Sequence, residues 1–462
     1  MYDFDFIVIG VGPAGEKAAA QAAYFGKRVA AIEQGPEPGG AGTHTGTVPS
    51  KTLRETAMYL SGYRTREMYG VAVELEPTAT LPRLMSRKEA IVASESARIR
   101  ENLRRHGVEY VRGRAKFVDA HTVEVSVDGG TRRLSGEVIL VATGSRPARP
   151  AEIDFADPCI HDSDEILALE RIPGSLAVIG AGVIGCEYAC MFAALGVKVT
   201  LVDGRDGLLG FIDEELVERL AGSMRRMGVD IRLGRRWKRI ARAGKEIVTS
   251  FEDGSTVAAE QLLFSAGREG CTRDLDLGAV GLVPEKRGYL VVDWRYRTSV
   301  PSIYAAGDVI GFPALAATSM EQGRVAACHA FGFEYKRSVG DLLPYGIYTI
   351  PELSSVGETE SSARQLAMPY AVGRAQYAQN ARGKIAGDTE GLLKLIVDRR
   401  TRKVVGVHAI GERATELVHV GQAVMHLDGT VDAFIEMVFN FPSLAEAYKY
   451  AAYDCLAQLA RD

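Results

Sequence analysis

Residues 6–34 of this chain read FIVIGVGPAGEKAAAQAAYFGKRVAAIEQ, and residues 176–204 read LAVIGAGVIGCEYACMFAALGVKVTLVDG. Each stretch contains a short apolar run, a glycine-rich turn, an alanine-rich segment and a second apolar run, which is the pattern of a strand, a helix and a strand. A shift of 170 positions superposes the glycines and the final acidic residue of the two stretches. The repeat predicts two βαβ units, and therefore two nucleotide-binding lobes of α/β type.

The glycine spacing in both stretches is that of a dinucleotide fingerprint. The first glycine of such a turn permits a sharp bend, the second lets backbone approach a pyrophosphate, and the third lets helix and strand pack closely. The start of the following helix offers free N–H groups to phosphates. An acidic residue, Glu33 or Asp203, follows each first glycine by 23 positions, where a carboxylate binds a ribose. The fingerprint glycines are Gly10, Gly12 and Gly15 in the first stretch and Gly180, Gly182 and Gly185 in the second.

The composition excludes several other classes of function. A chain of 462 residues is longer than a single hydrophobic core can accommodate, so several domains are expected. The net charge of −4 gives no reason to expect a nucleic-acid partner. No uncharged apolar stretch approaches the roughly 18–20 residues of a membrane helix, and the N-terminus lacks the pattern of a signal peptide. We therefore expect a cytoplasmic protein without a membrane partner.

The cysteines indicate neither a metal site nor a thiol redox motif. The chain has six, and none forms a C-x-x-C pair with another. In a reducing compartment such thiols are expected to be buried and free.

The segments outside the two repeats complete the predicted organisation. Residues 86–106 are expected to be helical, and short strands are expected over 108–142, 231–264 and 279–305. From about residue 341 the pattern changes to strands at Tyr345–Ile350, Leu392–Val397 and Lys403–Ile410, with helices at 411–427 and 443–460. This pattern predicts an α+β domain after the two lobes.

Two further strand ends carry a resemblance to a known family. Val141-Ala142-Thr143-Gly144 and Ile303-Tyr304-Ala305-Ala306-Gly307-Asp308 resemble motifs of the FAD-dependent pyridine nucleotide disulfide oxidoreductases. The resemblance implies that the first fingerprint holds FAD, that the second holds NAD(P), and that the C-terminal domain forms a dimer interface. It also implies four ranges: 1–147 and 271–340 for FAD, 148–270 for NAD(P), and 341–462 for dimerisation. The further FAD-binding residues that it implies are Gly40, Ala115, Thr143, Gly144, Gly307, Asp308 and Ala316.

The reactive groups of that family are missing from this chain. Gly42 and Thr47 occupy the two cysteine positions of its motif within Gly39–Lys51, so no disulfide can form there. Phe441 stands before a proline at the position of the family's histidine base. A dithiol needs a base nearby to form the attacking thiolate, so the joint loss suggests a reaction that needs neither. Electrons that enter the flavin as hydride would then leave to a second nucleotide.

Longer strings resemble one branch of this family, whose members exchange hydride between two pyridine nucleotides. They are Thr43–Lys51, residues 180–188, residues 346–352 and residues 439–448. This resemblance implies an FAD-dependent transhydrogenase that uses NAD(H) and NADP(H) in turn. Two alternatives stay open: an NAD(P)H-dependent reductase of quinones, dyes or metal ions, and a non-catalytic flavin redox sensor.

Four residues are the candidates for catalysis. Lys51 and Glu187 resemble the family's ion pair beside the flavin, where a cation stabilises the negative charge of the reduced ring. Thr47 is expected to cap the helix that starts near Val48-Pro49, with its hydroxyl near the flavin. His44 either lines the pocket or only packs.

The second fingerprint ends in residues that favour different nucleotides. Asp203 favours the free 2′-hydroxyl of NAD, whereas Arg205 favours the 2′-phosphate of NADP or is merely a loop residue. Gly267 is a further candidate at this site. A mixed site is what a transhydrogenase needs.

We also expect a homodimer or a higher homo-oligomer. Aromatic residues in the C-terminal region suit either a large apolar interface or the core of that domain. They are Phe434, Phe439, Phe441, Tyr448, Tyr450 and Tyr453.

Overall fold

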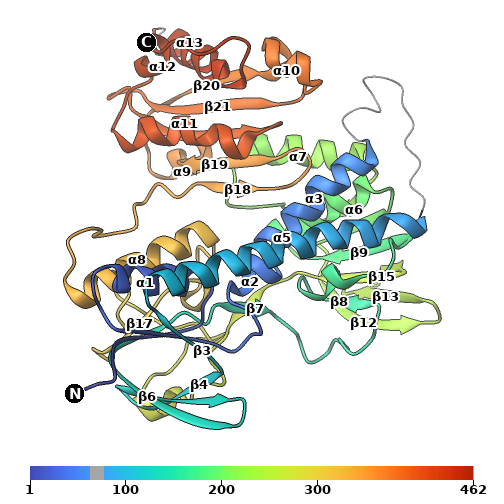
Figure 1. The fold of residues 1–462 in the computed structure, drawn as a ribbon. Coiled ribbons are helices and arrows are strands. Elements are labelled where there is room, and N and C mark those ends of the chain that lie inside the picture. The colour runs from blue at the N-terminus through green and yellow to red at the C-terminus, as the bar shows by residue number, and fades with distance from the viewer. Residues whose placement is uncertain (63–76, 461–462) are drawn as a thin grey trace.

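The computed structural model describes residues 1–62 and 77–460. The predicted ranges 1–147 and 341–462 therefore each include positions that lie outside the described residues. In Figure 1 the C-terminal sheet lies above the two lobes that contain the repeats. Within the described part of the chain, no helix has the length and apolar character needed to cross a bilayer.

The first lobe is built on a sheet with a parallel part and an antiparallel extension. Its strand β1 (FDFIVI) is buried over its last four residues, as expected for a strand covered on both faces. The long strand β6 pairs in parallel with β1 and β17 and antiparallel with β5, so the chain returns to this sheet after the second lobe. The strands are β1 (Phe4–Ile9), β2 (Val29–Glu33), β3 (Glu109–Arg112), β4 (Arg114–Asp119), β5 (Thr122–Val127), β6 (Gly130–Val141) and β17 (Ile303–Ala305).

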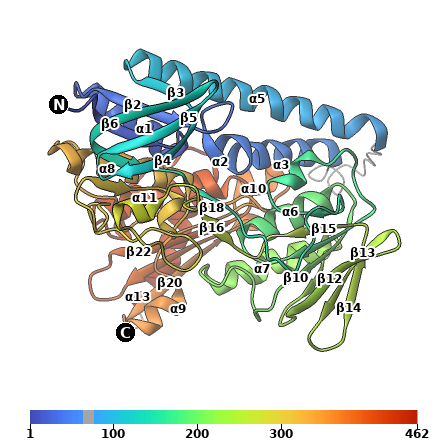
Figure 2. The ribbon, with the colours of Figure 1, turned by 90° about the horizontal axis from the view of Figure 1, so that it is seen from below.

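Helices α1, α5 and α8 pack on one face of this sheet's parallel part, whereas β4, β5 and residues of the segment 275–310 pack on the other. The long helix α5 extends along the first lobe, with α3 beside it (Figure 2). Helix α1 packs against α8, and α3 packs against the long helix α5. The small residues of α1 permit close packing, because Ala14, Ala18, Ala19 and Ala22 are all buried. The helices are α1 (Pro13–Tyr24), α2 (Gly40–His44), α3 (Thr47–Ser61), α5 (Pro77–Arg105) and α8 (Ala316–Phe331).

The second lobe repeats the first, as the sequence predicts. Phe6 pairs with Val29 in β1 and β2, and Leu176 pairs with Val199 in β9 and β10, so the register is preserved in the repeat. A parallel sheet of order β11-β10-β9-β15-β8 is again accompanied by three antiparallel strands. The elements are β8 (Ile160–His161), β9 (Ser175–Ile179), α6 (Val183–Ala194), β10 (Lys198–Val202), α7 (Glu214–Arg226), β11 (Asp230–Arg232), β12 (Trp237–Ala243), β13 (Glu246–Phe251), β14 (Thr256–Ala259) and β15 (Gln261–Phe264).

The C-terminal part is an antiparallel sheet covered by helices, which confirms the predicted α+β architecture. The strand order is β18-β19-β22-β21-β20, and α11 and α13 pack on the sheet. The elements are β18 (Tyr345–Ile347), β19 (Leu353–Gly357), α9 (Glu360–Gln365), β20 (Tyr370–Gln376), α10 (Ala381–Ala386), β21 (Leu392–Asp398), β22 (Val404–Ile410), α11 (Ala414–His426), α12 (Asp432–Glu436) and α13 (Ala447–Leu459).

Some local predictions were wrong. The range 279–305 contains one strand, β17, and otherwise turns and loops, because its apolar residues pack as isolated side chains under the first sheet. The helix expected over 86–106 starts earlier, at Pro77. The strands β19 and β20 were not predicted, since their sequences, LSSVG and YAVGRAQ, contain small or polar residues.

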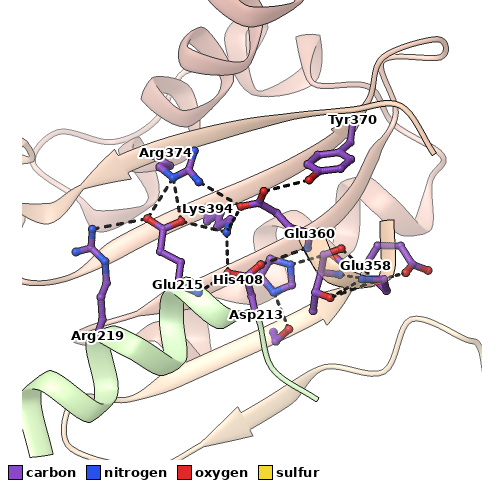
Figure 3. Close-up of polar contacts among 12 residues, drawn as sticks. Asp213, Glu215, Arg219, Glu358, Glu360, Tyr370, Arg374, Lys394 and His408 are labelled. Atoms are coloured by element: carbon purple, nitrogen blue, oxygen red, sulfur yellow. Dashed lines mark hydrogen bonds and ion pairs between the residues drawn. The ribbon is translucent and has the colours of Figure 1, made fainter. Parts of the chain in front are cut away.

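An ion cluster joins the second lobe to the C-terminal sheet (Figure 3). The buried Lys394 Nζ lies 2.7 Å from Asp213 Oδ1, 3.0 Å from Glu215 Oε2 and 2.6 Å from Glu360 Oε1. Arg374 also pairs with Glu215 and Glu360, at 2.9 Å and 3.2 Å. Burial raises the pKa of the Asp213 carboxyl, but the hydrogen bond from Lys394, the nearby positive charges and the hydrogen bond from the Glu360 N–H together hold this pKa below its usual value. The cluster therefore keeps α7, whose N-cap is Asp213, against strand β21.

Lys394→Met is expected to lower the free energy of unfolding by about 3–5 kcal/mol, because it leaves three carboxylates without their shared cation. Denaturant titration measures the change. The control is Lys403→Met, which removes an exposed pair with Asp428 and is expected to cost less than about 1 kcal/mol. Equal losses in the two variants would contradict a structural role for the cluster.

Candidate functional site

One large cavity lies where the two lobes and the C-terminal part meet. Its volume is about 770 Å³. The first lobe supplies most of its wall, α6 supplies Glu187 and Tyr188, and the C-terminal part supplies Tyr348 and His419. Because three parts of the chain contribute to it, the cavity forms only in the folded whole.

The two glycine turns have the same geometry, and the first and third glycines of each leave no room for a side chain. A methyl group on Gly15 would lie 1.9 Å from the Gly10 carbonyl oxygen, and one on Gly185 would lie 1.8 Å from that of Gly180. Gly10 and Gly180 have φ values of 96° and 111°, a region that favours glycine. Each turn places the first residues of a helix at the end of a parallel strand, where backbone N–H groups attract an anion.

The acidic residue at the end of each second strand binds the glycine turn itself. Glu33 Oε2 accepts a hydrogen bond of 2.9 Å from the Val11 N–H, and Asp203 Oδ2 accepts one of 2.6 Å from the Ala181 N–H. Glu33 lines the cavity, which places a carboxylate beside the first turn. Asp203 occupies the equivalent place in the second lobe.

Arg205 closes over Asp203. Its Nε and Nη2 atoms donate to the two carboxylate oxygens of Asp203 at 3.0 Å and 2.8 Å. Burial raises the pKa of Asp203, but the hydrogen bonds from the Arg205 guanidinium and the Ala181 N–H outweigh burial, so this pKa lies below its usual value. The two residues on which the sequence argument for nucleotide preference rests therefore form one ion pair.

Lys51 and Glu187 meet at the cavity, although they come from different lobes. Lys51 Nζ donates to Glu187 Oε2 at 2.7 Å, and the backbone N–H of Tyr348 donates to Glu187 Oε1 at 2.8 Å. The ammonium group of Lys51 also lies 4.9 Å from the centre of the Tyr348 ring, within the range of a cation–π contact. All three residues line the cavity, so a fixed cation is placed at its wall.

The predicted capping role of Thr47 is wrong. Thr47 is the first residue of α3, the N-cap position is Gly46, and no side chain caps this helix in the described structure. The Ser50 hydroxyl instead donates to the Gly46 carbonyl oxygen at 2.6 Å. Thr47 is exposed and lines the cavity, so its hydroxyl is free to face a ligand.

His44 also lines the cavity, but its ring is held by the protein. Its Nε2 lies 3.1 Å from the Pro38 carbonyl oxygen and 3.4 Å from the Ser96 hydroxyl. Because a carbonyl oxygen only accepts, the proton of the ring is placed on Nε2. These two contacts fix the orientation of the His44 ring.

A chain of polar groups runs along the wall near the second strand-end motif. Arg268 Nε donates to Ser145 Oγ at 2.8 Å, and Ser145 Oγ donates to Asp308 Oδ2 at 2.9 Å. The Thr143 hydroxyl is buried and has no hydrogen-bond partner in the described protein. An unsatisfied buried hydroxyl at a cavity wall indicates a place for a polar ligand atom.

The structure separates the predicted cofactor residues into two groups. One group lines the cavity: Gly10, Gly12, Glu33, Gly40, His44, Thr47, Lys51, Ala115, Thr143, Gly144, Glu187, Gly307, Asp308 and Ala316. Gly15 lies beneath it, against the Gly10 carbonyl. The other group lies outside the lining of this cavity, around the second glycine turn or beside β16 (Arg268–Gly270): Gly180, Gly182, Gly185, Asp203, Arg205 and Gly267.

Some cavity residues were not predicted from the sequence as site residues. Tyr348 is one, and only its place in the string at 346–352 pointed to it. Asp164 is another, and burial raises the pKa of its carboxyl. No motif marks Asp164, and the string around Tyr348 does not by itself place that residue at a cavity, because the fold brings both residues there.

The thiols do not restore the missing redox pair. Cys186 and Cys190 are fully buried and do not line the cavity. Cys271 lines it, and burial raises the pKa of its thiol, which disfavours the reactive thiolate. At Gly42 a methyl group would lie 3.0 Å from Pro13 Cγ, so a larger side chain would crowd this wall.

Comparison with known families gives two matches that together span most of the chain. Residues 4–323 match the model of the pyridine nucleotide-disulphide oxidoreductases. Residues 343–452 match the model of the dimerisation domain of the same family.

Relatives and solved structures match along nearly the whole length. The chain is similar to the protein named soluble pyridine nucleotide transhydrogenase of Mycobacterium tuberculosis (strain ATCC 25177 / H37Ra), with 46% identity over 99% of this chain and 98% of the relative. The transhydrogenase of the same name from Azotobacter vinelandii is 42% identical, over 99% of both chains. The crystal structure of LpdA from Mycobacterium tuberculosis superposes with a TM-score of 0.89 at 29% identity, covering 97% of this chain and 99% of that one. The HOCl-induced flavoprotein disulfide reductase RclA from Escherichia coli gives a TM-score of 0.87 at 29% identity, covering 96% and 98%.

Thr47→Ala is expected to leave the free energy of unfolding unchanged within about 0.5 kcal/mol, because Thr47 does not cap α3. The matched variant is Thr359→Ala, since Thr359 caps α9 and accepts from the Ser362 N–H at 3.1 Å. That variant is expected to lose about 1 kcal/mol. Denaturant midpoints measure both changes, and a larger loss at Thr47 than at Thr359 would refute the assignment.

Proposed function

The chain belongs to the pyridine nucleotide-disulphide oxidoreductase family, and we propose that it is an FAD-dependent enzyme that transfers hydride between NADPH and NAD⁺. One observation carries the proposal. The cavity keeps the Lys51–Glu187 pair, while Gly42, Thr47 and Phe441 stand where a thiol pair and a histidine base would be needed for disulfide chemistry. The names of the relatives, at 40–46% identity, support it.

The cavity residues fit FAD. Gly10 and Gly15 let the backbone of the first turn pack tightly, since Cβ atoms there would lie 2.4 Å from the Ala142 carbonyl oxygen and 1.9 Å from that of Gly10. A pyrophosphate would lie against this turn, where the start of the helix offers free N–H groups. A methyl group on Gly40 would lie 2.9 Å from Gly12 Cα, so α2 closes tightly on this turn. Glu33 would hold the adenosine ribose, Asp308 the ribityl chain, and the unsatisfied Thr143 hydroxyl a polar atom of the cofactor. The remaining residues assigned to FAD are Gly144, Ala115, Gly307 and Ala316.

Bound FAD would supply an acceptor and donor of hydride. Lys51 would hold a positive charge at the cavity wall, where it stabilises negative charge that develops during transfer. Glu187 and the Tyr348 ring fix the position of that charge. Thr47 would contribute a hydroxyl at the wall, and the assignment of a direct catalytic role to His44 stays a prediction.

The second glycine turn would bind the nucleotides. Gly180, Gly182 and Gly185 would receive the pyrophosphate, and Asp203 the ribose of NAD(H). This chain has one such turn beyond the FAD turn, so the two nucleotides would use it one after the other. Their exchange is therefore a ping-pong reaction. The four ranges given above remain our assignment of the domains, with Gly267 near the boundary at residue 270.

The alternative is a reductase of quinones, dyes or metal ions. The open wall at Gly42 and Thr47 would admit such an acceptor. The relatives do not favour it, because those at 40–46% identity carry the transhydrogenase name. The intact Lys51–Glu187 pair is an argument against the function of a non-catalytic redox sensor.

The test mixes flavin-loaded protein with NADPH and thio-NAD⁺ under anaerobic conditions and follows the absorbance of reduced thionicotinamide. Sustained turnover is expected, with none on lipoamide. Lys51→Met is expected to lower kcat by roughly 10²–10³-fold, because the positive charge at the wall is lost. Lys403→Met, a surface lysine of the C-terminal part, should match the unmodified enzyme.

A different result would favour the alternative. Rapid turnover with a quinone, together with no reduction of thio-NAD⁺ by flavin-loaded protein, would overturn the proposed exchange. Full activity of Lys51→Met would remove its assigned role but leave the exchange in place.

We further propose that the enzyme is a homodimer and is cytoplasmic. The match to a dimerisation domain supports the dimer. The aromatic residues expected at the interface divide into three sets. Phe434 and Tyr448 are buried in the core of their own chain, and Phe439 is partly buried against that core. Phe441, Tyr450 and Tyr453 are exposed by 50–68%. The exposed set, with Val438, forms the apolar surface that a partner would cover.

Sedimentation is expected to give the mass of two chains of 49.9 kDa each. Phe441→Glu places a charge on the exposed apolar surface and is expected to shift the mass toward one chain. Lys403→Met again serves as the control and should sediment as a dimer. A wild-type mass of one chain at micromolar concentration would refute the dimer.

A further inference from the structure

The proposed exchange creates an electrostatic problem at the nucleotide turn, and this inference rests on that proposed function. NADP(H) differs from NAD(H) by a 2′-phosphate, which adds about −1.5 to −2 charges near neutral pH. The carboxylate of Asp203 stands where the ribose of a nucleotide is expected, and it would repel that phosphate. A site that accepts both nucleotides must therefore supply positive charge beside Asp203.

Arg205 supplies only part of this charge. Its guanidinium already donates to both oxygens of Asp203, at 3.0 Å and 2.8 Å. The pair is close to neutral as a unit, so it removes the repulsion but adds little attraction. The side chain of Arg205 is 62% exposed, so the pair is open to solvent and to a ligand.

Arg236 lies next to this pair and comes from a different element. It sits in the loop between β11 and β12, whose neighbour Arg235 donates its backbone N–H to the Asp203 carbonyl oxygen at 2.9 Å. A methyl group added to Gly204 would lie 3.0 Å from Arg236 Cγ, so the stem of Arg236 packs over the residue between Asp203 and Arg205.

The guanidinium of Arg236 is the uncommitted cation of this loop. Arg232 pairs with Asp230 at 2.9 Å, and Arg235 pairs with Asp253. Across the described residues, no carboxylate pairs with Arg236, and the residue is exposed. Asp206, which follows Arg205 after β10, lies beside Gly234, where an added methyl group would lie 2.8 Å from Asp206 Oδ1. Because neighbouring arginines are matched by acids and Arg236 is not, it has a full positive charge available for an anion.

We propose that Arg236 binds the 2′-phosphate of NADP(H) and thereby lets one site accept both nucleotides. With NAD(H), Asp203 holds the ribose hydroxyls and Arg236 stays in solvent. With NADP(H), the planar guanidinium of Arg236 donates to the phosphate oxygens, while Arg205 neutralises Asp203 beneath it. Arg236 is thus a residue that determines nucleotide specificity, placed outside the segment that follows β10.

The test measures the dissociation constants of NADP⁺ and NAD⁺, which do not reduce the flavin, for the oxidised holoenzyme by equilibrium dialysis. Arg236→Ala is expected to weaken NADP⁺ binding about tenfold, since one charge-assisted contact with a phosphate is lost. Binding of NAD⁺ should change by less than about twofold. Arg236→Lys keeps the charge and is expected to recover part of the affinity for NADP⁺.

The matched control is Arg239→Ala. Arg239 is also exposed and lies on β12, but the three atoms nearest to a methyl group on Gly204 all belong to Arg236. The variant Arg239→Ala removes the same net charge as Arg236→Ala. Comparison of the two therefore separates a local contact with the phosphate from the general attraction of a basic surface. Rising salt should weaken NADP⁺ binding to the unmodified enzyme more steeply than to Arg236→Ala.

Two results would overturn the inference: an equal loss of NADP⁺ affinity in Arg236→Ala and Arg239→Ala, or an equal loss of NADP⁺ and NAD⁺ affinity in Arg236→Ala. The proposed function is checked separately by the reduction of thio-NAD⁺ by NADH, which needs no 2′-phosphate. If that exchange proceeds while Arg236→Ala binds NADP⁺ normally, only the role of Arg236 fails. If flavin-loaded enzyme exchanges no hydride between any pair of nucleotides, the proposed function fails.

Discussion

The ion pair between Lys51 and Glu187 is the contact on which the site depends. It joins α3 of the first lobe to α6 of the second at 2.7 Å, and the Tyr348 N–H brings the C-terminal part to the same carboxylate at 2.8 Å. A carboxylate as buried as that of Glu187 needs such partners, since an unpaired charge in this place would be costly. One pair thus links the two lobes to the C-terminal part and holds a positive charge at the cavity wall.

The second constraint is the close approach of backbone in the two glycine turns. Gly15 and Gly185 exclude any side chain because their Cβ positions fall within 2 Å of a carbonyl oxygen. This constraint acts over a few consecutive residues, so the sequence predicts it fully, and the 170-residue repeat reappears in the strand register. The strands β19 and β20 lack such a local signal, since their place is fixed by pairing with β22 and β21.

The distinction between local motifs and tertiary packing also applies to the residues of the site. Lys51, Glu187 and Asp308 were predicted because each belongs to a motif, and the structure brings all three to one cavity. Asp164 reaches that cavity through tertiary packing alone, which no local pattern encodes. Thr47 shows the converse error: a threonine before Val-Pro has the features of an N-cap, yet the chain starts the helix one residue earlier, with Gly46 as the cap.

The nucleotide preference that we propose for the second glycine turn depends on the balance of charge beside it. A lone carboxylate after β10 would select NAD, and a lone arginine would select NADP. This chain has both, and they neutralise each other through two hydrogen bonds. A neutral pair selects neither nucleotide strongly, so the difference in affinity must come from a charge outside the pair. The loop between β11 and β12 packs on Gly204 and contains Arg235 and Arg236. Arg235 is paired with Asp253, whereas Arg236 has no carboxylate partner among the described residues.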